Sequence, residues 1–416
     1  MSHSLPSVST FPPQESFWVA GRRGPLLAAF LLTEAGFMVW ILLGTLSIHI
    51  ARDLGLDAGE IGLMTGMPIL TGTLLRLPVG MMADRLGPKK TGIAVMSLVL
   101  CAMCLFWLYV PMNFIILLVA GAFLGLAGTV FSVAIPLVSR HFPPELQGAA
   151  LGVTAVAGAG TVVSALVGPM LADAFGWQKV FGWALVPTLL AMVVFWWLGE
   201  DHHLPPRTER THVSGWQVLR YPESLWFSWF YAVTFGGFIG LTTSLVLFFH
   251  TQFQIEPATA GAMTACCVLG GALFRPVGGH LADRFGGIRT LQSAFLATIA
   301  AMALLVLMGQ QPLFAWLGLL IAMSALGLGN GALFQLIPLR FPRRMGTVAG
   351  LVGTAGGIGG FLLAWGLGVL KQNTGEFKIG FLVLGALALL GLTGLVIVKQ
   401  RWRTTWGAPS QTRGRV

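Results

Sequence analysis

Two arginines lie in the middle of long apolar segments of this 416-residue chain. Arg76 and Arg275 are 199 residues apart, and each lies in nearly the same sequence motif: LLRLPVGMMADRLG at 74–87 and LFRPVGGHLADRFG at 273–286. An arginine at the centre of a membrane helix costs at least about 2.5–3.5 kcal/mol on insertion scales. A chain that accepts this cost at matching places in two halves is most simply interpreted as holding an anion between them.

The composition is that of a polytopic membrane protein. Hydrophobic residues make up 55% of the chain and charged residues 10%, with a mean hydropathy of +0.80, whereas a soluble domain has about 25% charged residues. Apolar stretches long enough to cross a bilayer as helices recur along the whole length. We therefore predict an all-α fold with twelve transmembrane helices, at 25–50, 61–83, 91–110, 113–139, 147–171, 179–198, 223–250, 258–284, 289–310, 312–339, 346–370 and 378–399.

The sequence repeats itself, which predicts two pseudo-equivalent halves. Residues 199–222 contain prolines and charges without periodicity, and they are expected to form a cytoplasmic linker. They separate an N-terminal six-helix half, 1–198, from a C-terminal six-helix half with a short basic tail, 223–416. Such parallel repeats are typical of transporters that bind substrate between their halves, near the bilayer midplane. Eight residues recur at an offset of 199: Gly62, Thr65, Gly72, Arg76, Gly80, Asp84, Arg85 and Gly87 match Gly261, Thr264, Gly271, Arg275, Gly279, Asp283, Arg284 and Gly286.

The basic residues predict the orientation. With both termini in the cytoplasm, nineteen lysines and arginines fall on the cytoplasmic side and four on the other, as the positive-inside rule requires. This topology explains the net charge of +10 without a nucleic-acid partner, because no basic helix carries interleaved aromatic residues. Residues 1–21 lack Lys and Arg, so no signal peptide is expected there. We expect a multi-pass monomer in the lipid bilayer of a cell inner membrane.

No motif predicts an enzyme. The chain has no GxxxxGK[ST] phosphate loop, no HExxH pair and no serine elbow. The four cysteines, Cys101, Cys104, Cys266 and Cys267, all lie inside apolar spans, where packing is the expected role rather than metal binding. We therefore expect no catalytic residue, no metal and no cofactor.

Two loops resemble a known family signature. Gly80-x-x-x-Asp84-Arg85-x-Gly87-x-Lys89-Lys90 is similar to the signature loop of the major facilitator superfamily, and a weaker copy follows at 279–286. Within that superfamily the chain resembles the nitrate/nitrite porter family. The resemblance rests on the arginine pair, on TFGGFIGL at 234–241, on GLVGTAGGIGGF at 350–361 and on GLGNGALFQLIP at 327–338.

The resemblance implies roles for individual residues. Arg76 and Arg275 would grip the anion from opposite sides, Phe131 and Phe235 would stack on it, and Tyr231 would line the pocket. One feature departs from the family pattern, because the helix 5 run VTAVAGAGTVVSAL at 153–166 lacks the family's substrate-binding asparagine. Three hydroxyl residues are open as its replacement: Thr154, Thr161 and Ser164.

The chemistry of the pair suits nitrate. Nitrate is planar and singly charged, and guanidinium offers it a flat bidentate contact that lysine does not provide. Two bare positive charges repel in a medium of low dielectric constant, so bound anion should permit closure of the site. We therefore expect a secondary active transporter of nitrate, and also nitrite, working by alternating access. Two alternatives stay open: a carrier of another small monovalent anion such as a monocarboxylate, and a membrane nitrate sensor that does not transport.

Gating and coupling residues can also be assigned from the sequence. The Asp-Arg pairs at the ends of the second and eighth helices are expected to latch the outward-facing state, and glycines in helices 5 and 11 to let those helices slide. Glu34, an intramembrane carboxylate, is a candidate for proton coupling; it is alternatively expected to pair with Arg76 or Arg275, or to face the aqueous vestibule. Proton symport and nitrate/nitrite exchange are both open. The gating residues are Asp84, Arg85, Asp283, Arg284, Gly158 and Gly356.

Overall fold

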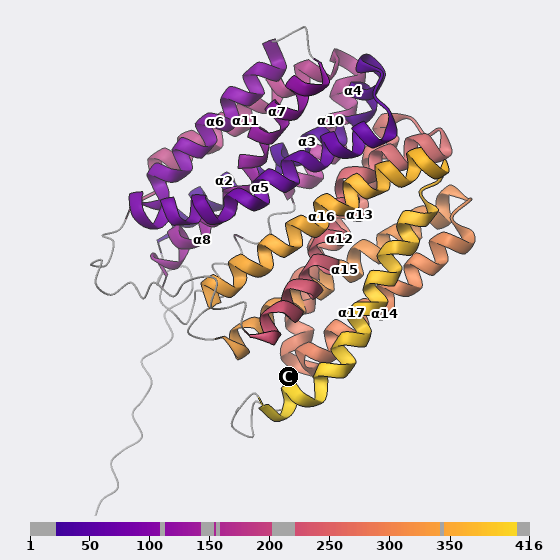
Figure 1. Ribbon diagram of the computed structural model, residues 1–416. Coiled ribbons are helices and arrows are strands. Elements are labelled where there is room, and N and C mark those ends of the chain that lie inside the picture. The colour runs from indigo at the N-terminus through magenta and orange to yellow at the C-terminus, as the bar shows by residue number, and fades with distance from the viewer. Residues whose placement is uncertain are drawn as a thin grey trace, which may run out of the picture.

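The computed structural model describes residues 22–108, 113–142, 154, 159–201, 221–341 and 345–405, and within these ranges it contains helices and no strands. Figure 1 shows two groups of long helices, one coloured indigo to magenta and the other pink to yellow. The first group contains α2 (Arg23–Trp40), α3 (Leu42–Thr45), α4 (Ser47–Leu54), α5 (Ala58–Leu86), α6 (Pro88–Leu108), α7 (Phe114–Leu124), the 3₁₀ helix η1 (Gly125–Thr129), α8 (Phe131–Ser139), α10 (Ala159–Phe175) and α11 (Trp177–Leu198). The second contains α12 (Pro222–Phe253), α13 (Pro257–Phe285), α14 (Gly287–Met308), α15 (Pro312–Arg340), α16 (Met345–Thr374) and α17 (Lys378–Thr405).

The described helices correspond to the twelve expected spans, the fifth of them only in part. In the described part of the chain, nine helices are long and apolar enough to cross a bilayer. The three other expected spans correspond to the series α2–α4, to the 29-residue α5 and to α10, the described part of the fifth span. Polar and charged residues, Arg76 among them, lower the hydropathy of α5. The prediction of an all-α membrane protein is confirmed.

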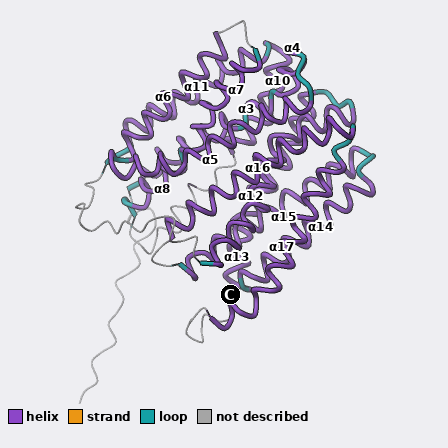
Figure 2. Tube along the Cα trace, in the orientation of Figure 1, coloured by secondary structure: helices purple, strands orange, loops and turns teal. Residues whose placement is uncertain are grey.

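Local sequence signals explain where the helices begin. Asp57 and Glu60 form a capping box at the start of α5: Glu60 N donates to Asp57 Oδ1 at 2.8 Å, and Asp57 N donates to Glu60 Oε2 at 3.0 Å. Proline occupies the first turn of α12, α13 and α15, where its missing N–H leaves no helical bond unmade. The loops that connect these helices within the described ranges are short, as Figure 2 shows.

Two expected helices are interrupted. The first, predicted at 25–50, breaks at Ile41 and Leu46, and the fourth, predicted at 113–139, passes through η1 in its middle. The sequence of η1 is GLAGT, and its glycines permit close packing: a side chain at Gly128 would meet Trp40 Nε1 at 2.7 Å. A 3₁₀ stretch inside a longer helix often marks a functional hinge.

The two groups of helices meet near the start of α5, which we call the Asp57 end. There Gln372 Nε2, on α16, donates to Asp57 Oδ2 at 3.0 Å. A side chain at Gly62 would meet the Trp365 carbonyl oxygen at 3.0 Å, so α5 and α16 are nearly in backbone contact. Such close approach is what small residues provide where lipid gives helices no hydrophobic reason to associate.

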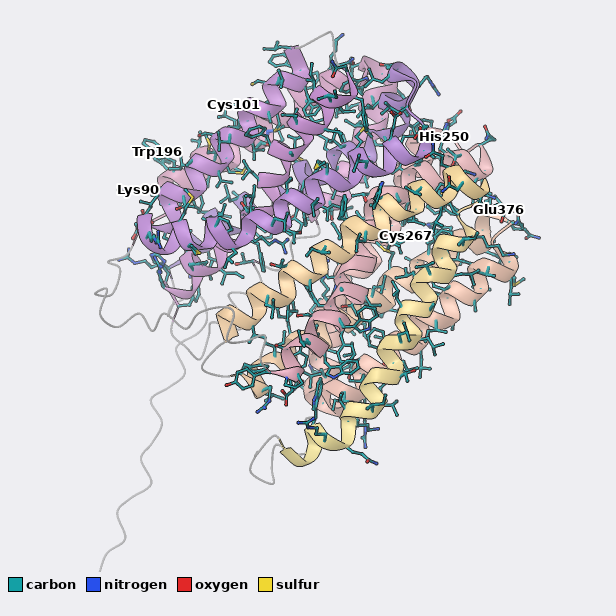
Figure 3. All side chains as sticks on the ribbon, viewed as in Figure 1. Lys90, Cys101, Trp196, His250, Cys267 and Glu376 are labelled. Carbon is teal, nitrogen blue, oxygen red and sulfur yellow. The ribbon has the colours of Figure 1, made fainter. Side chains whose placement is uncertain are left out.

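The opposite end of the molecule carries the loop after α5, and we call it the Arg85 end. Figure 3 shows Lys90 near this end, whereas His250 and Glu376 lie near the Asp57 end. Large apolar side chains on the outer flanks are highly exposed, including Trp197 at 78% and Leu307 at 79%. Exposed apolar surface of this kind is expected where helices face lipid.

Candidate anion-binding site

The structure brings Arg76 and Arg275 to the same aromatic ring. Arg76 Cζ on α5 lies 5.7 Å from the centre of the Phe235 ring on α12, and Arg275 Cζ on α13 lies 5.8 Å from that centre. The two guanidinium carbons therefore cannot be farther apart than the sum of these distances. One cation comes from each group of helices, as the repeat suggested.

Arg76 is held by its own group of helices. Its Nε donates to the carbonyl oxygen of Gly128, in η1, at 3.2 Å. Its Cζ also lies 5.2 Å from the centre of the Trp40 ring, within cation–π range. Trp40 is buried, and its Nε1 donates to the Pro68 carbonyl oxygen at 2.8 Å, which fixes the ring. The guanidinium of Arg76 is thus supported on one face and anchored at one nitrogen.

Arg275 is held differently. Its Cζ lies 4.5 Å from the centre of the Phe238 ring on α12. Its Nε is buried and has no hydrogen-bond partner among the residues that the structure describes. Within the same residues, no carboxylate lies at ion-pair distance from either arginine. In the described part of the chain, therefore, no acidic side chain is close enough to neutralise either arginine.

Tyr231 and Phe235 form the aromatic wall of the site. Their rings stack at 5.0 Å with an interplanar angle of 1°, and Tyr231 meets Phe334 edge-on at 5.3 Å. Tyr231 is buried and close enough to interact electrostatically with both arginines. Gly356, on α16, packs directly on this wall: a side chain there would meet Phe235 Cδ1 at 3.0 Å and Tyr231 Cε1 at 2.7 Å. Glycine at 356 leaves the space that the two rings occupy.

Phe131 is not brought to the arginines in the same way. It begins α8 and lies three residues after Gly128, half-buried against the apolar core. Among the described residues it forms no ring–ring or cation–π contact, in contrast to Phe235. Sequence reasoning did not single out Trp40 and Phe238 as parts of the site, because their roles depend on contacts between helices.

Glu34 pairs with neither arginine. Its Oε2 accepts a hydrogen bond from the backbone N–H of Gly160, near the start of α10, at 2.5 Å. Its Oε1 is buried and has no partner in the described residues. Among the candidates for the absent asparagine, Ser164 Oγ lies 3.4 Å from Thr45 Oγ1, and Thr154 and Thr161 are buried.

Of the expected gating residues, Arg85, Asp283 and Arg284 lie at the Arg85 end, whereas Gly356 packs on the aromatic wall. Arg85, Asp283 and Arg284 are exposed, and Arg284 Cζ lies 5.3 Å from the centre of the Phe285 ring. The side chain of Asp84 and the whole of Gly158 lie outside the described part of the chain.

A residue that sequence reasoning missed supports the signature loop. Asp201, which follows α11, accepts a hydrogen bond from Lys89 N at the start of α6, at 2.8 Å. Gly87, in the same loop, has φ +97° and lies against the Asp201 carboxylate. A carboxylate at a helix N-terminus satisfies an otherwise unpaired N–H and favours the helix dipole.

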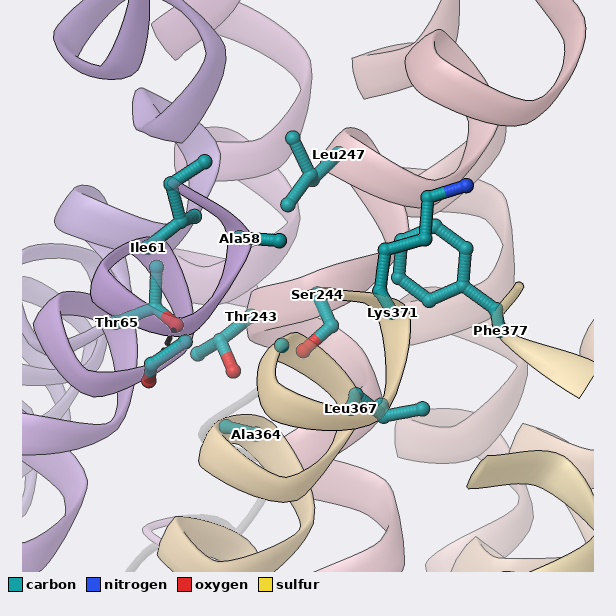
Figure 4. Close-up of a pocket in the computed structure, with 12 residues that line it drawn as sticks. Ala58, Ile61, Thr65, Thr243, Ser244, Leu247, Ala364, Leu367, Lys371 and Phe377 are labelled. Carbon is teal, nitrogen blue, oxygen red and sulfur yellow. Dashed lines mark hydrogen bonds between the residues drawn. The ribbon is translucent and has the colours of Figure 1, made fainter. Parts of the chain in front are cut away.

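A small pocket lies away from the arginines, at the Asp57 end between α5, α12 and α16 (Figure 4). Three of the polar side chains that line it bond to carbonyls of their own helices: Thr65 to Gly62, and both Thr243 and Ser244 to Gly240. Few polar groups remain for a ligand, so the pocket is interpreted as part of the seam between the two groups of helices.

Comparison with known proteins identifies the family of the chain. The family model of the Major Facilitator Superfamily matches residues 27–364. A "Nitrite extrusion protein" of Bacillus subtilis (strain 168) is 32% identical over 371 residues, which cover 89% of this chain and 92% of the relative. The chain is a member of the Major Facilitator Superfamily, in its nitrate/nitrite porter family.

Other relatives in this family are similar over comparable lengths. A "Probable nitrate/nitrite transporter NarK2" of Mycobacterium tuberculosis (strain ATCC 25618 / H37Rv) is 32% identical over 384 residues, 90% of this chain and 95% of the relative. Among solved structures, an inward-facing bacterial homologue of the human lysosomal transporter Spinster has a TM-score of 0.70 at 17% identity, covering 90% of this chain and 96% of that one. The nucleoside transporter NupG has a TM-score of 0.71 at 12% identity, covering 90% and 99%. At these identities the solved structures show the fold alone.

Proposed function

We propose that this protein carries nitrate, and also nitrite, across the cell inner membrane by alternating access, with the anion held between Arg76 and Arg275. The observation that carries the proposal is the placement of one guanidinium from each group of helices around the Phe235 ring, with no carboxylate at ion-pair distance in the described residues. The printed names of the Bacillus and Mycobacterium relatives support the choice of anion.

The electrostatics give a reason for closure on a loaded site. Two unpaired guanidinium groups in a water-poor interior repel each other, and a bound monovalent anion reduces their joint charge from two to one. Nitrate matches the planar, bidentate geometry of guanidinium. The Tyr231–Phe235 wall presents flat faces beside the cations, which favours a planar ion. The anion thereby favours the occluded arrangement, and the empty protein resists it.

The access cycle requires two halves that move against each other. We assign residues 1–198 and 223–416 to these halves and 199–222 to a cytoplasmic linker. The Asp57 end is assigned to the outside, and the Arg85 end, with both termini, to the cytoplasm. Contact between α5 and α16 at the Asp57 end supports an inward-facing arrangement. The exposure of Arg85, Asp283 and Arg284 accords with a cytoplasmic latch that is open.

In the outward-facing state, Asp84 with Arg85 and Asp283 with Arg284 are assigned to that latch. Gly158 and Gly356 are assigned to the sliding of helices 5 and 11. The tight fit of Gly356 against the aromatic wall supports this role for Gly356. Phe131 is retained as a substrate-stacking residue in the anion-bound state, since it follows the segment that anchors Arg76.

Glu34 is the proton-coupling candidate. Its unpartnered Oε1 and its bond to Gly160 link the first helix to the fifth, so a change in its protonation would act on helix 5. Proton symport would use this group, whereas nitrate/nitrite exchange would not, because the two charges cancel.

Flux into liposomes tests the proposal. We expect purified protein to take up nitrate, and Arg76→Ala to abolish uptake while remaining folded and inserted. Arg289→Ala removes the same charge from an exposed position and is the matched control. Normal nitrate flux in Arg76→Ala would contradict the assignment. Stronger competition by formate or pyruvate than by nitrite would favour a monocarboxylate carrier, and nitrate binding without flux would favour a sensor.

A further inference from the structure

The surroundings of the two arginines are pseudo-symmetric. Arg76 lies over Trp40 of the first helix, and Arg275 lies over Phe238 of the seventh. The glycine one turn before each arginine packs on the same ring. A side chain at Gly72 would meet Trp40 Nε1 at 2.8 Å, and one at Gly271 would meet Phe238 Cδ2 at 2.7 Å. The two rings are therefore counterparts, and other contacts of Arg76 should have counterparts around Arg275.

The fourth and tenth helices supply that next pair. The segment GLAGTVFSVAIP at 125–136 aligns with GLGNGALFQLIP at 327–338, with glycine and leucine at the start and isoleucine and proline at the end. Packing supports the alignment, because Gly125 lies against Gly72 and Gly327 against Gly271. In this alignment Asn330 occupies the place of Gly128, whose carbonyl oxygen anchors Arg76 Nε.

The backbones of the two helices differ at this place. The fourth helix passes through the 3₁₀ segment η1, and a backbone carbonyl there accepts from Arg76. The tenth helix, α15, is an uninterrupted α-helix from Pro312 to Arg340, in which each interior carbonyl accepts from the N–H four residues on. The carbonyl oxygen of residue 330 therefore already accepts one hydrogen bond within the helix, whereas a side chain at this position can offer Arg275 an acceptor that makes no such bond.

Asn330 has that acceptor, and it is unused. Its side chain is 3% exposed, and neither Oδ1 nor Nδ2 has a hydrogen-bond partner among the described residues. Arg275 Nε is likewise buried without a partner there. The two residues lie on contacting backbones, since a side chain at Gly331 would meet the Arg275 carbonyl carbon at 3.0 Å. Buried polar groups are nearly always paired, so these three atoms call for an explanation.

We propose that Asn330 is a positioning residue for Arg275. When the anion is held, Asn330 Oδ1 accepts the Nε–H of Arg275, as the Gly128 carbonyl accepts that of Arg76. The terminal nitrogens of both arginines are then free to meet the anion from opposite sides. A neutral amide does this without cancelling the charge of Arg275, which a carboxylate would do. This inference rests on the proposed function of the arginine pair.

Asn330→Leu separates positioning from packing. Leucine has the same number of side-chain heavy atoms, branched at the same carbon, so the variant removes the amide without opening a large cavity. A buried polar group without a hydrogen bond costs free energy, so replacing it by an apolar group should be neutral or stabilising. We expect the melting temperature to stay the same or rise, while nitrate binding to purified protein weakens about tenfold, the effect of one lost hydrogen bond to a charged group. Asn330→Asp should lose measurable nitrate binding because its carboxylate pairs with Arg275.

Thr298→Val is the matched control. Thr298 is buried in α14 and bonds only to its own helix, at Ala294 O, 2.9 Å away, so nitrate affinity should not change. Nitrate affinity of Asn330→Leu within twofold of the wild type would overturn the inference. Weaker binding with a lower melting temperature would assign Asn330 to helix packing and also overturn it. If the leucine variant does not fold, Asn330→Ala is judged by the same affinity criterion. Wild-type protein that does not bind nitrate would refute the proposed function instead.

Discussion

The fit of Gly356 against the aromatic wall makes a quantitative prediction. A methyl group at this position would lie 2.7 Å from Tyr231 Cε1 and 3.0 Å from Phe235 Cδ1, closer than carbon atoms tolerate. Relief requires α16 to move away from α12 or the two rings to turn, and overpacking of this kind costs about 1–3 kcal/mol. Because both guanidinium carbons lie within 5.8 Å of the centre of the Phe235 ring, either movement displaces the surface that we assign to the anion.

If the anion-bound state carries that cost, Gly356→Ala weakens nitrate binding by about fivefold to about 150-fold, since each 1.4 kcal/mol corresponds to tenfold. The assay is nitrate KM in liposomes together with nitrate affinity in detergent. Two matched substitutions on the same helix serve as controls. A side chain at Gly366 meets nothing within 4 Å, and one at Gly353 meets Arg76 Nη1 at an ordinary 3.7 Å.

Gly366→Ala should leave transport unchanged and stabilise the helix by up to about 1 kcal/mol, as alanine usually does in place of glycine. Gly353→Ala should have an effect smaller than that of Gly356→Ala. The reasoning is refuted if Gly356→Ala binds nitrate as tightly as Gly366→Ala does, because the wall would then not belong to the site.

Two further predictions concern the charged residues. Arg76→Lys keeps the positive charge but loses the Nε bond to Gly128 and the planar fork, so we expect nitrate affinity to fall by at least about tenfold; an unchanged affinity would mean that charge alone suffices. Glu34→Gln should abolish any acceleration of nitrate uptake by an inward proton gradient while leaving exchange against internal nitrite intact; retained acceleration would remove Glu34 from the coupling mechanism.

The sequence predicted the helices well because long apolar runs are local signals, and its internal repeat singled out the arginine pair as the candidate site. Long apolar runs specify membrane helices wherever they occur, and a repeated motif marks Arg76 and Arg275 as equivalent without any knowledge of packing. The resemblance to known transporters then named Tyr231 and Phe235, which the structure brings together at the arginines.

The supports of the arginines were not predictable in this way. The bond from Arg76 to Gly128 joins residues that are 52 positions apart, and it depends on a 3₁₀ segment that hydropathy does not reveal. In the sequence, Trp40 is not distinguished from the other tryptophans of the membrane helices. Only the packing of the first helix on η1 places its ring against the Arg76 guanidinium. For Glu34 the sequence left three possibilities open: Arg76, Arg275 or the aqueous vestibule. In the structure its partner is instead the backbone N–H of Gly160 in α10.

Nitrate binding to the purified protein tests the central claim most directly. Equilibrium binding to the wild type, Arg76→Ala, Arg275→Ala and the double variant would be measured under one set of conditions. We expect one nitrate per wild-type chain, and loss of measurable binding in each single variant, since the two cations from opposite halves are proposed to hold one anion together. Wild-type affinity in either single variant would contradict it.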